Sequence, residues 1–384
     1  MCRASFSAYD SPTLWYDFFV AILKEKFTKF EAWFDKYDRH ISSAGLLLGF
    51  IVDSLTLRRI DLPLENAILF SYIFLGGFGL IIINMFEAGR WTGTFMQKVR
   101  KWMPLVIQYA FGGLFSAFFI FYSRSASFGS SWPFVIVLVG LLIGNELFKK
   151  SYVRLGFQTS VYFMAVFSYL IFVVPILVNR IGAHVFLLSG ILSLVFIWYF
   201  IKLLLKIVPD RIREAQGVLI VSIGCIYAFM NIFYFTNIIP PIPLSLKAAG
   251  MYHELVKLPE GGYVAEQEAR PWYAFFRRFP EYHLDGEPVY AYSRIFAPTD
   301  ISTTIVHEWQ KRNEDTDSWE TRSRISFKID GGSGVGYRGY TLKEAVDSGL
   351  WRVNIKTTRG QVLGRIKFRA IENSPNLQLE SVTL

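Results

Sequence analysis

Long apolar runs fill most of the first 239 residues, and short polar loops separate them. A helix needs about 20 residues to cross about 30 Å of hydrocarbon, and seven of the runs have about this length. The seven runs lie at residues 41–57, 66–86, 102–122, 131–148, 157–178, 184–205 and 216–236. The pattern therefore predicts a transmembrane domain of seven helices over residues 41–239. The first span is the weakest, because it is short and contains Asp53.

A proline cluster ends the apolar part of the chain, because proline supplies no backbone donor and disfavours helix in the residue before it. After Pro240, Pro241 and Pro243, a connector with some structure is expected over residues 240–288. Beyond the connector, apolar and polar residues alternate with a period of two, which is typical of strands. The alternating segments lie near residues 289–296, 303–310, 319–329, 350–357 and 361–371. They predict an all-β domain over residues 289–384, an immunoglobulin-like β-sandwich.

The clearest part of this domain is a hairpin with one apolar and one basic face. Trp351 and Val353 lie on one face of its first strand, and Arg352 and Lys356 lie on the other. The second strand repeats the pattern and places Arg365 on the basic face. We therefore expect the hairpin to pack one face on a core and to show the basic face to water.

Residues 13–37 predict an amphipathic helix ahead of the first span. Aromatic residues recur there at helical spacing, and four lysines lie among them. Such a helix tends to lie in the headgroup plane of an anionic leaflet, and a helix that binds a partner protein is the alternative. Residues 1–40 are therefore predicted to form a cytoplasmic amphipathic segment.

Loop charge predicts the orientation of the spans. The N-terminal segment and the second, fourth and sixth loops hold sixteen Lys and Arg, whereas the opposite loops hold four. By the positive-inside rule the N-terminus is cytoplasmic, and seven spans then place the β domain outside the cytoplasm. Without the first span, the basic N-terminus and the later basic loops would lie on opposite sides. We expect a multi-pass protein of the bacterial inner membrane, and the first span is expected to direct insertion.

Composition narrows the function classes. The chain is 52% hydrophobic and 18% charged, which is too little charge for a soluble protein of ordinary composition. Most of the net charge of +9 lies in the membrane half, where topology explains it, so no nucleic-acid partner is expected. Two cysteines, Cys2 and Cys225, allow no disulfide framework, and no two of the five histidines stand four residues apart. No metal and no cofactor is predicted. His307 alternates with Ile305 and Trp309, which favours a hydrogen-bonded strand residue near the edge of the core.

The C-terminal region carries residues that resemble a known family. These are Gly349-Leu350-Trp351-Arg352-Val353 and the run from Gly360 to Phe368, together with His307-Glu308-Trp309, Trp319-Glu320-Thr321-Arg322 and the junction Ile239 to Lys247. They resemble the bacterial domain of unknown function 2914, in members that carry a multispan N-terminal region. The resemblance covers roughly the last 95 residues and implies no activity, so it identifies no catalytic residue.

Polar residues inside the spans are costly and need individual interpretation. Asp53, His184 and Asn231, with Pro175, are predicted at similar depth in the outer half of the bundle. Together they would line a polar pocket that opens outward. The alternative, which we favour, is that Arg58 or Arg59 neutralises Asp53 at the interface.

The β domain offers candidate binding residues near its loops and on its basic face. They are Trp309, Trp319, Tyr337, Tyr340, Arg352 and Arg365. Aromatic rings and arginines bind glycans by stacking and hydrogen bonding, although half or more of the rings in a small domain belong to its core. The leading hypothesis is an envelope protein or glycan as ligand, with the helices as anchor and scaffold. The alternative is a transporter, or an enzyme for a lipid-linked substrate, with its site in the outer half of the bundle.

Overall fold

The structure is a computed structural model that describes residues 50–57, 62–90, 93–125, 128–147, 155–240, 243–269, 279–298, 301–331, 336–372 and 377–384. Residues from Asp53 onward form one compact unit that contains both helices and sheets. The predicted amphipathic helix at residues 13–37 lies outside the described residues, as do residues 41–49 of the first predicted span.

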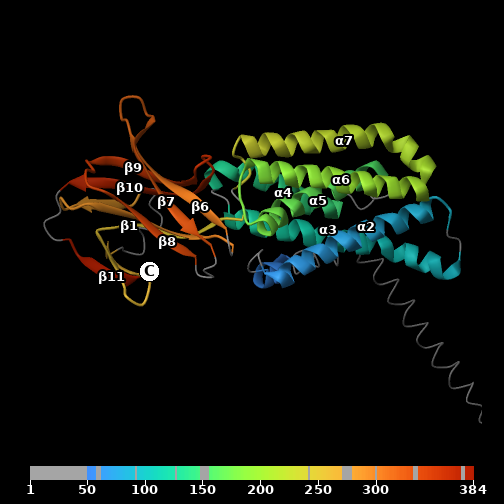
Figure 1. Cartoon of the computed structure of the whole chain (residues 1–384), viewed down its shortest axis with the longest axis horizontal. Coiled ribbons are helices and arrows are strands. Elements are labelled where there is room, and N and C mark those ends of the chain that lie inside the picture. Colours follow the sequence, from blue (N-terminus) through green and yellow to red (C-terminus); the bar gives the residue numbers. More distant parts are fainter. Residues whose placement is uncertain are drawn as a thin grey trace, which may run out of the picture. The chain divides into compact units, whose positions relative to one another are not determined.

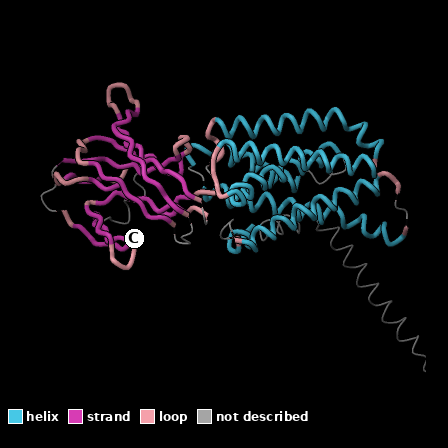
Figure 2. Tube along the Cα trace, in the orientation of Figure 1, coloured by secondary structure: helices cyan, strands magenta, loops and turns pink. Residues whose placement is uncertain are grey.

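Helices fill the described chain as far as residue 235, and strands follow (Figure 2). Residues 50–56 are helical. The six helices after them, shown in Figure 1, are α2 (Pro63–Glu87), α3 (Thr94–Ser125), α4 (Phe128–Leu147), α5 (Leu155–Val178), α6 (Ala183–Ile207) and α7 (Pro209–Phe235).

Five helices of the described chain are long and apolar enough to cross a membrane. They are α2, residues 102–123 of α3, α5, α6 and α7. In α4 the apolar stretch is shorter, at residues 132–141. Large apolar side chains stay exposed on these helices, for example Phe74 at 61% on α2 and Val221 at 65% on α7. A soluble protein seldom exposes so much apolar surface, so the five helices indicate a membrane protein.

Small residues let the helices approach one another closely. Gly113 of α3 lies against the ring of Tyr72 from α2, where a β-carbon would collide with the ring. Gly77 of α2 lies against the hydroxyl group of Tyr162 from α5, where a β-carbon would likewise collide with the side chain. Aromatic rings thus fill the space that glycine leaves, and the contacts of α2 with α3 and α5 hold the bundle together.

Eleven strands form three sheets in the described part of the C-terminal region. The strands are β1 (Ser245–Tyr252), β2 (Glu254–Lys257), β3 (Tyr263–Glu268), β4 (Glu281–Leu284), β5 (Val289–Phe296), β6 (Ser302–Arg312), β7 (Trp319–Asp330), β8 (Tyr337–Lys343), β9 (Gly349–Thr357), β10 (Val362–Glu372) and β11 (Leu379–Thr383). Their orders are β4-β10-β9-β6-β7, β1-β5-β8 and β11-β3-β2. We refer to them, in this order, as the five-stranded sheet, the Arg sheet and the small sheet. The Arg sheet is named for Arg294 on β5 and Arg338 on β8.

The predicted β segments are strands. The expected hairpin is β9 and β10, which pair antiparallel with Arg352 opposite Lys367 and Asn354 opposite Arg365. Strands β1 to β4 lie within the stretch predicted as a connector, and β1 pairs with β5 over residues 245–252. The sequence therefore holds more strand than its alternation indicates, because β1 contains three small residues, Ala248, Ala249 and Gly250, that blur the pattern.

The inner faces of the five-stranded sheet and the Arg sheet share one core. Trp309, Trp351 and Phe368 from the first pack with Val289 and Ala291 from the second. A second cluster joins Ile305 and Ile355 to Ile295, and Ile181 from the connection between α5 and α6 packs against it. Burial of these large side chains is the main favourable term for the β region.

His307 is fully buried in this core and bridges the two sheets. Its Nε2 lies 2.9 Å from Oγ of Ser293 on β5, and its Nδ1 lies 2.9 Å from Oγ1 of Thr341 on β8. Burial lowers the pKa of His307 to about 4, because the charged imidazolium would lose its hydration. The residue is therefore a neutral hydrogen-bonded strand residue, as predicted, and it lies in the core itself.

The turn between β9 and β10 rests on the end of α7. The Asn237 side chain donates to the carbonyl oxygen of Arg359 at 3.4 Å, and Gln361 donates to that of Ile239 at 3.4 Å. The guanidinium of Arg359 lies 4.2 Å from the ring centre of Tyr234. The hairpin that the sequence predicts most clearly is thus also the part of the β region that contacts the last helix.

Candidate functional site

The outer face of the five-stranded sheet carries a row of basic residues around one carboxylate. Glu308 on β6 lies opposite Arg324 on β7 and Asn354 on β9, and Asn354 lies opposite Arg365 on β10. Side chains at directly opposite positions point to the same face, so the row crosses four strands. We call this surface, with its neighbours Gln310, Trp319, Arg352 and Lys356, the basic face.

Glu308 is the centre of the basic face and is almost fully buried by the cations around it. Its carboxylate accepts from Arg324 at 2.8 Å, from Lys356 at 2.7 Å and from Asn354 at 3.2 Å. Burial alone would raise the pKa of Glu308, but the hydrogen bonds from Lys356, Arg324 and Asn354 outweigh it and hold the pKa below its usual value. Glu308 therefore stays charged and fixes the positions of the cations.

A second set of hydrogen bonds holds the arginines that the sequence predicts as binding residues. Arg352 donates to Oε1 of Gln310 at 2.7 Å, and Arg365 donates to Oδ1 of Asn354 at 2.9 Å. The Arg352 guanidinium also lies 4.3 Å from the ring centre of Trp319. The structure thus brings together Trp319, Arg352 and Arg365. Their guanidinium groups are oriented before any ligand arrives, which lowers the entropy cost of binding.

A groove of about 700 Å³ lies beside the basic face, at the end where β6 turns into β7. Arg312 and Arg322 line it from the turn side, and Gly349 and Arg369 line it from β9 and β10. Ligand sites for small molecules have volumes of about 300–1,000 Å³, so the groove has the size of a binding site. Its lining is mostly polar and charged, which suits a ligand with many hydroxyl or acidic groups.

The remaining predicted binding residues lie elsewhere. Trp309 is fully buried between the two sheets, so it belongs to the core and cannot touch an external ligand. Tyr337 and Tyr340 are on β8, and their side chains are partly exposed. Tyr340 packs edge to face with Tyr263 of the small sheet, with 5.6 Å between ring centres. The two tyrosines therefore do not join the basic face.

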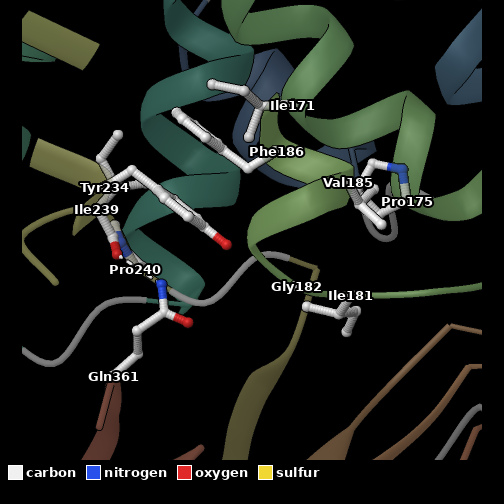
Figure 3. Close-up of a pocket in the computed structure, with 10 residues that line it drawn as sticks. All are labelled: Ile171, Pro175, Ile181, Gly182, Val185, Phe186, Tyr234, Ile239, Pro240 and Gln361. Carbon is white, nitrogen blue, oxygen red and sulfur yellow. Dashed lines mark hydrogen bonds between the residues drawn. The ribbon is translucent and has the colours of Figure 1, made fainter. Parts of the chain in front are cut away.

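The intramembrane polar residues do not line the cavity found near the end of α7 in the described part of the chain. A cavity of about 20 Å³ is lined by Pro175, Phe186, Tyr234 and Gln361 among others, and the rings of Phe186 and Tyr234 stack face to face. Figure 3 shows the residues that line it. Asp53, His184 and Asn231 are not among its lining residues. This volume holds about one water molecule, which is too little for a transported solute or a lipid-linked substrate.

Each of those three residues has its own local setting. The amide of Asn231 donates to the carbonyl oxygen of Tyr227 in the preceding turn at 2.8 Å. His184 is exposed at the start of α6. Asp53 is half-buried near Ser116 and Tyr72. Arg58 and Arg59, the expected partners of Asp53, lie outside the described residues.

A polar cluster that the sequence analysis did not single out joins three helices. Asn84 of α2 donates to Oε1 of Gln158 from α5 at 2.9 Å, and Arg211 of α7 donates to Oδ1 of Asn84 at 3.0 Å. Asn84 and Gln158 are fully buried. No spacing rule along the chain connects residues so far apart, so only the fold reveals the contact.

A second missed cluster lies where β1, β3 and β4 end. The two ring nitrogens of His253 contact Asp285 at 3.0 Å and Glu268 at 3.2 Å, and Glu268 also accepts from Nδ1 of His283 at 3.0 Å. Burial lowers the pKa of His253, but the hydrogen bonds and charges of Glu268 and Asp285 raise it above its usual value. Both ring nitrogens then act as donors, which requires the charged imidazolium. In the described part of the chain, no group of three His, Cys, Asp or Glu residues is arranged to hold a metal ion.

The comparisons with known proteins give one family. Its description is protein of unknown function, DUF2914, and its model covers β6 to most of β10. Residues 302–370 match the DUF2914 family. The resemblance predicted from the sequence is therefore confirmed for this segment. The DUF2914 segment holds Glu308, Trp319, Arg352 and Arg365, so the basic face lies within it, whereas β1 to β5 precede it.

The comparisons with curated proteins and with solved structures support no shared fold or function. The search of curated proteins found no match to this chain. Among solved structures, the Pseudomonas fluorescens alkylpurine DNA glycosylase AlkC, bound to DNA containing an abasic site analogue, aligns with 82% of this chain and 99% of its own at 9% identity. Its TM-score of 0.21 is too low to support a shared fold or function.

Proposed function

We propose that this chain is a multi-pass protein of the bacterial inner membrane whose extracytoplasmic β domain binds an acidic glycan of the cell envelope. The basic face and the groove beside it form the binding surface, and the helices serve as anchor and scaffold. The β domain has the immunoglobulin-like sandwich type, and the protein binds its ligand without chemical conversion.

The orientation rests on loop charge. Five apolar helices support the membrane domain. We infer the sixth and seventh spans from α4, whose apolar stretch is shorter, and from the helix that contains Asp53. The basic residues of the sequence then lie mainly on one side, which is cytoplasmic by the positive-inside rule. An odd number of spans places the β domain on the opposite side.

The observation that supports the ligand class is the fixed lattice of cations on the basic face. Glu308, Gln310 and Asn354 hold Arg324, Arg352 and Arg365 by hydrogen bonds of 2.7–2.9 Å. Each guanidinium uses its Nε in this lattice, so other N–H groups remain to bind a carboxylate or phosphate. Arginine forks fit planar acidic groups, and a row of them fits a polymer that repeats such groups.

A pair of polysaccharides with the same backbone tests the ligand class. The full chain in nanodiscs of zwitterionic lipid is titrated with polygalacturonate and with its neutral methyl ester, and tryptophan fluorescence reports binding. We expect binding of the acid and little of the ester. Arg352→Gln and Arg365→Gln should each weaken binding roughly tenfold, the size of one charge-assisted hydrogen bond. Lys257→Gln on the small sheet removes the same charge elsewhere and should leave binding unchanged.

Three results would contradict the proposal. Equal binding of acid and ester would remove the role of charge, and an equal loss in Lys257→Gln would remove the role of the basic face. If envelope proteins are cross-linked through residue 352 while no acidic glycan binds, the ligand is a protein. The orientation has a separate test: protease added to spheroplasts should cut the β domain, and a protected domain would place it in the cytoplasm.

A further inference from the structure

We propose that Arg294 and Arg338, with Tyr292, form a binding site for a phosphate-type oxyanion on the outer face of the Arg sheet. This site is separate from the basic face and lies at the membrane-proximal end of β5 and β8. The proposal is independent of the glycan ligand.

The two arginines face each other across neighbouring strands. Strands β5 and β8 pair antiparallel, with Arg294 directly opposite Arg338. Their β-carbons are therefore about 5 Å apart on one face of the sheet. Like charges at directly opposite positions destabilise a sheet, so this pair costs stability unless an anion lies between the two guanidinium groups.

Both arginines have a buried donor without an acceptor. The Nε atoms of Arg294 and Arg338 are buried and make no hydrogen bond within the described structure. A buried donor that stays unpaired costs about 1–3 kcal/mol, and more when it is charged. Two such donors at opposite positions indicate that the acceptor is a bound group and not a part of the described chain.

Tyr292 adds a third polar group to the same place. It is two residues before Arg294 on β5, so it points to the same face, and only 1% of its surface is exposed. Burial raises the pKa of Tyr292, and the charges of Arg294 and Arg338 and a contact of the hydroxyl with the Arg338 guanidinium oppose the rise, so the hydroxyl lies close to both arginines. Within the described residues its oxygen makes no hydrogen bond of full geometry. The hydroxyl is therefore placed to donate to the anion.

The surroundings leave the charge of the pair uncompensated. Within the described residues, no carboxylate lies within ion-pair distance of Arg294 or Arg338, whereas Arg324 on the basic face is bound to Glu308. Gly262 lies beside the Arg338 guanidinium with a φ of 103°, a conformation that favours glycine. A β-carbon there would lie 3.0 Å from the carbonyl oxygen of Leu384 and 4.0 Å from Arg338 Nη1, so the backbone of Leu384 is the closer neighbour and Arg338 is at ordinary contact distance.

Chemistry and position favour a phosphate group. Two arginine forks and a tyrosine hydroxyl supply donors to several oxygens of one tetrahedral anion. Arg294 lies opposite Ala248, three residues after the start of β1, and β1 follows the end of α7 at Phe235 after a short connection. Three residues of strand span about 10 Å, so a lipid headgroup is within reach if α7 crosses the membrane. A lipid phosphate and a soluble phosphate are the two sources of this chemistry.

Anion-dependent stability of the full chain tests the site. Delipidated protein in a nonionic detergent is heated in phosphate and in chloride of equal ionic strength, and protein in nanodiscs is compared with and without phosphatidylglycerol. A ligand at 100 times its Kd shifts the folding equilibrium about 100-fold, which raises the unfolding temperature measurably. Native mass spectrometry counts the phosphatidylglycerol that stays bound.

The variants Arg294→Gln and Arg338→Gln should abolish the stabilisation by anions, and in chloride they should be at least as stable as the wild type, because the repulsion is gone. Arg338→Lys keeps the charge without the fork and should retain part of the effect. Lys257→Gln is the control and should respond to phosphate as the wild type does. Arg352→Gln weakens glycan binding and leaves Arg294 and Arg338 in place, so the two proposals fail separately.

Each outcome decides the proposal. Stabilisation by phosphate alone identifies a soluble anion, and stabilisation only by phosphatidylglycerol with retained lipid identifies a headgroup. The proposal is overturned if neither probe stabilises the wild type, or if the glutamine variants respond as the wild type does. It is also overturned if both variants are strongly destabilised in chloride, since the arginines would then serve packing alone.

Discussion

Arg324, Arg352 and Arg365 each donate to an acceptor on a neighbouring strand of the five-stranded sheet, whereas Arg294 and Arg338 face each other on the Arg sheet and the Nε of each has no acceptor in the described chain. The first arrangement is complete without a ligand, and the cations stay where the lattice holds them. The second is incomplete within the described chain. The basic face is therefore a surface that selects a partner by fixed charge, whereas the pair of Arg294 and Arg338 is a site that gains stability when an anion binds.

The two sheets nevertheless share their interior. Trp309 on β6 is fully buried among residues of both sheets, and its Nε1 donates to Oγ1 of Thr341 on β8 at 3.3 Å. His307 bonds to the same Thr341 oxygen from the neighbouring position on that face. The outer faces of the two sheets therefore differ in chemistry, but both depend on the same core. Substitutions in the core should have the largest effects on the stability of the β region.

The largest effect is expected from Trp309→Ala, which removes a fully buried ring and leaves a cavity. Substitutions of this kind cost about 3–5 kcal/mol. Hydrogen exchange of peptides from β5, β6 and β9, followed by mass spectrometry, measures the free energy of local opening. Trp319→Ala on the basic face is the matched control and should cost about 1 kcal/mol or less, since it loses mainly the stacking with Arg352. Equal costs for the two variants would contradict the assignment of core and face.

These two tryptophans show what the sequence can predict about the β region. The alternation of Ile305, His307 and Trp309 places Trp309 on the apolar side of its strand, so its burial was accessible from local pattern. The hairpin of β9 and β10 was predicted for the same reason. The lattice around Glu308 was not, because it depends on which strands become neighbours and in what register. Neighbours from β7 and β9 meet Glu308, and Arg365 of β10 joins through Asn354, only after the sheet has formed.

The bundle shows the same limit. Apolar runs predict the helices, and five of them meet the length and apolarity of a span within the described residues. The polar residues that the sequence singled out by depth, Asp53 and Asn231, do not meet at the cavity in Figure 3. Asn84 and Gln158 do meet, because the rotation of each helix about its axis decides which polar group faces inward. Hydropathy contains no information on that rotation.

The second-largest effect is expected from acid. The pKa of His307 is about 4 in the folded protein, below its ordinary value of 6.5, so the unfolded chain binds the proton first as the pH falls. Stability is therefore unaffected above pH 6.5 and falls below it, by about 2 kcal/mol at about pH 5 and about 3 kcal/mol at about pH 4. Urea unfolding of the β region at these pH values measures the loss.

His307→Gln is the control for this acid limb. Glutamine cannot titrate, so the fall between pH 6.5 and about 5 should become small even if the variant is less stable at neutral pH. Glu268, Glu308 and Asp347 have lowered pKa values, and the stability that each contributes is lost only as the pH falls through the carboxylate range below. If the stability of His307→Gln still falls between pH 6.5 and about pH 5, the loss belongs to another titrating group.

A smaller effect is expected from Glu308→Gln, which tests whether the basic face is complete in itself. The neutral amide still accepts one hydrogen bond, but Arg324 and Lys356 lose their counter-charge. We expect a loss of about 2 kcal/mol, since hydrogen bonds to charged groups contribute about 1.5–3 kcal/mol. Hydrogen exchange of β6 and β9 measures it. High salt should reduce the difference between variant and wild type, because part of it is repulsion among exposed cations.

The contrast with the Arg sheet sharpens this prediction. Removing a charge from the lattice should cost stability, whereas Arg338→Gln in chloride should not, because the pair of Arg294 and Arg338 has no counter-charge to lose. A Glu308→Gln variant as stable as the wild type would show that the cations of the basic face are held without the carboxylate.

The smallest expected effect lies at the other end of the pH range. The pKa of His253 is raised by Glu268 and Asp285, so the stability it contributes is fully present below pH 6.5 and is lost as the pH rises through the folded value. The sign is thus opposite to that of His307. We expect a loss of about 1 kcal/mol, the contribution of an ordinary hydrogen bond. It should be confined to the contacts of His253 with β3 and β4, which hydrogen exchange of residues 263–268 and 279–284 resolves.

Asp285→Asn removes the negative charge of one of the two acceptors of His253 and leaves the other acceptor charged. The variant therefore separates the loss of stability at high pH that belongs to His253 from general effects of pH. The variant should show only part of this loss while its acid limb, which belongs to His307, stays as in the wild type. His253 stacks on Tyr282 with 4.4 Å between ring centres, and this contact survives in the variant, so the fold should be kept. If the loss of stability at high pH is unchanged in Asp285→Asn, Glu268 alone holds the charged imidazolium of His253. The contact of His253 with Asp285 at the end of β4 would then contribute nothing to the pH dependence.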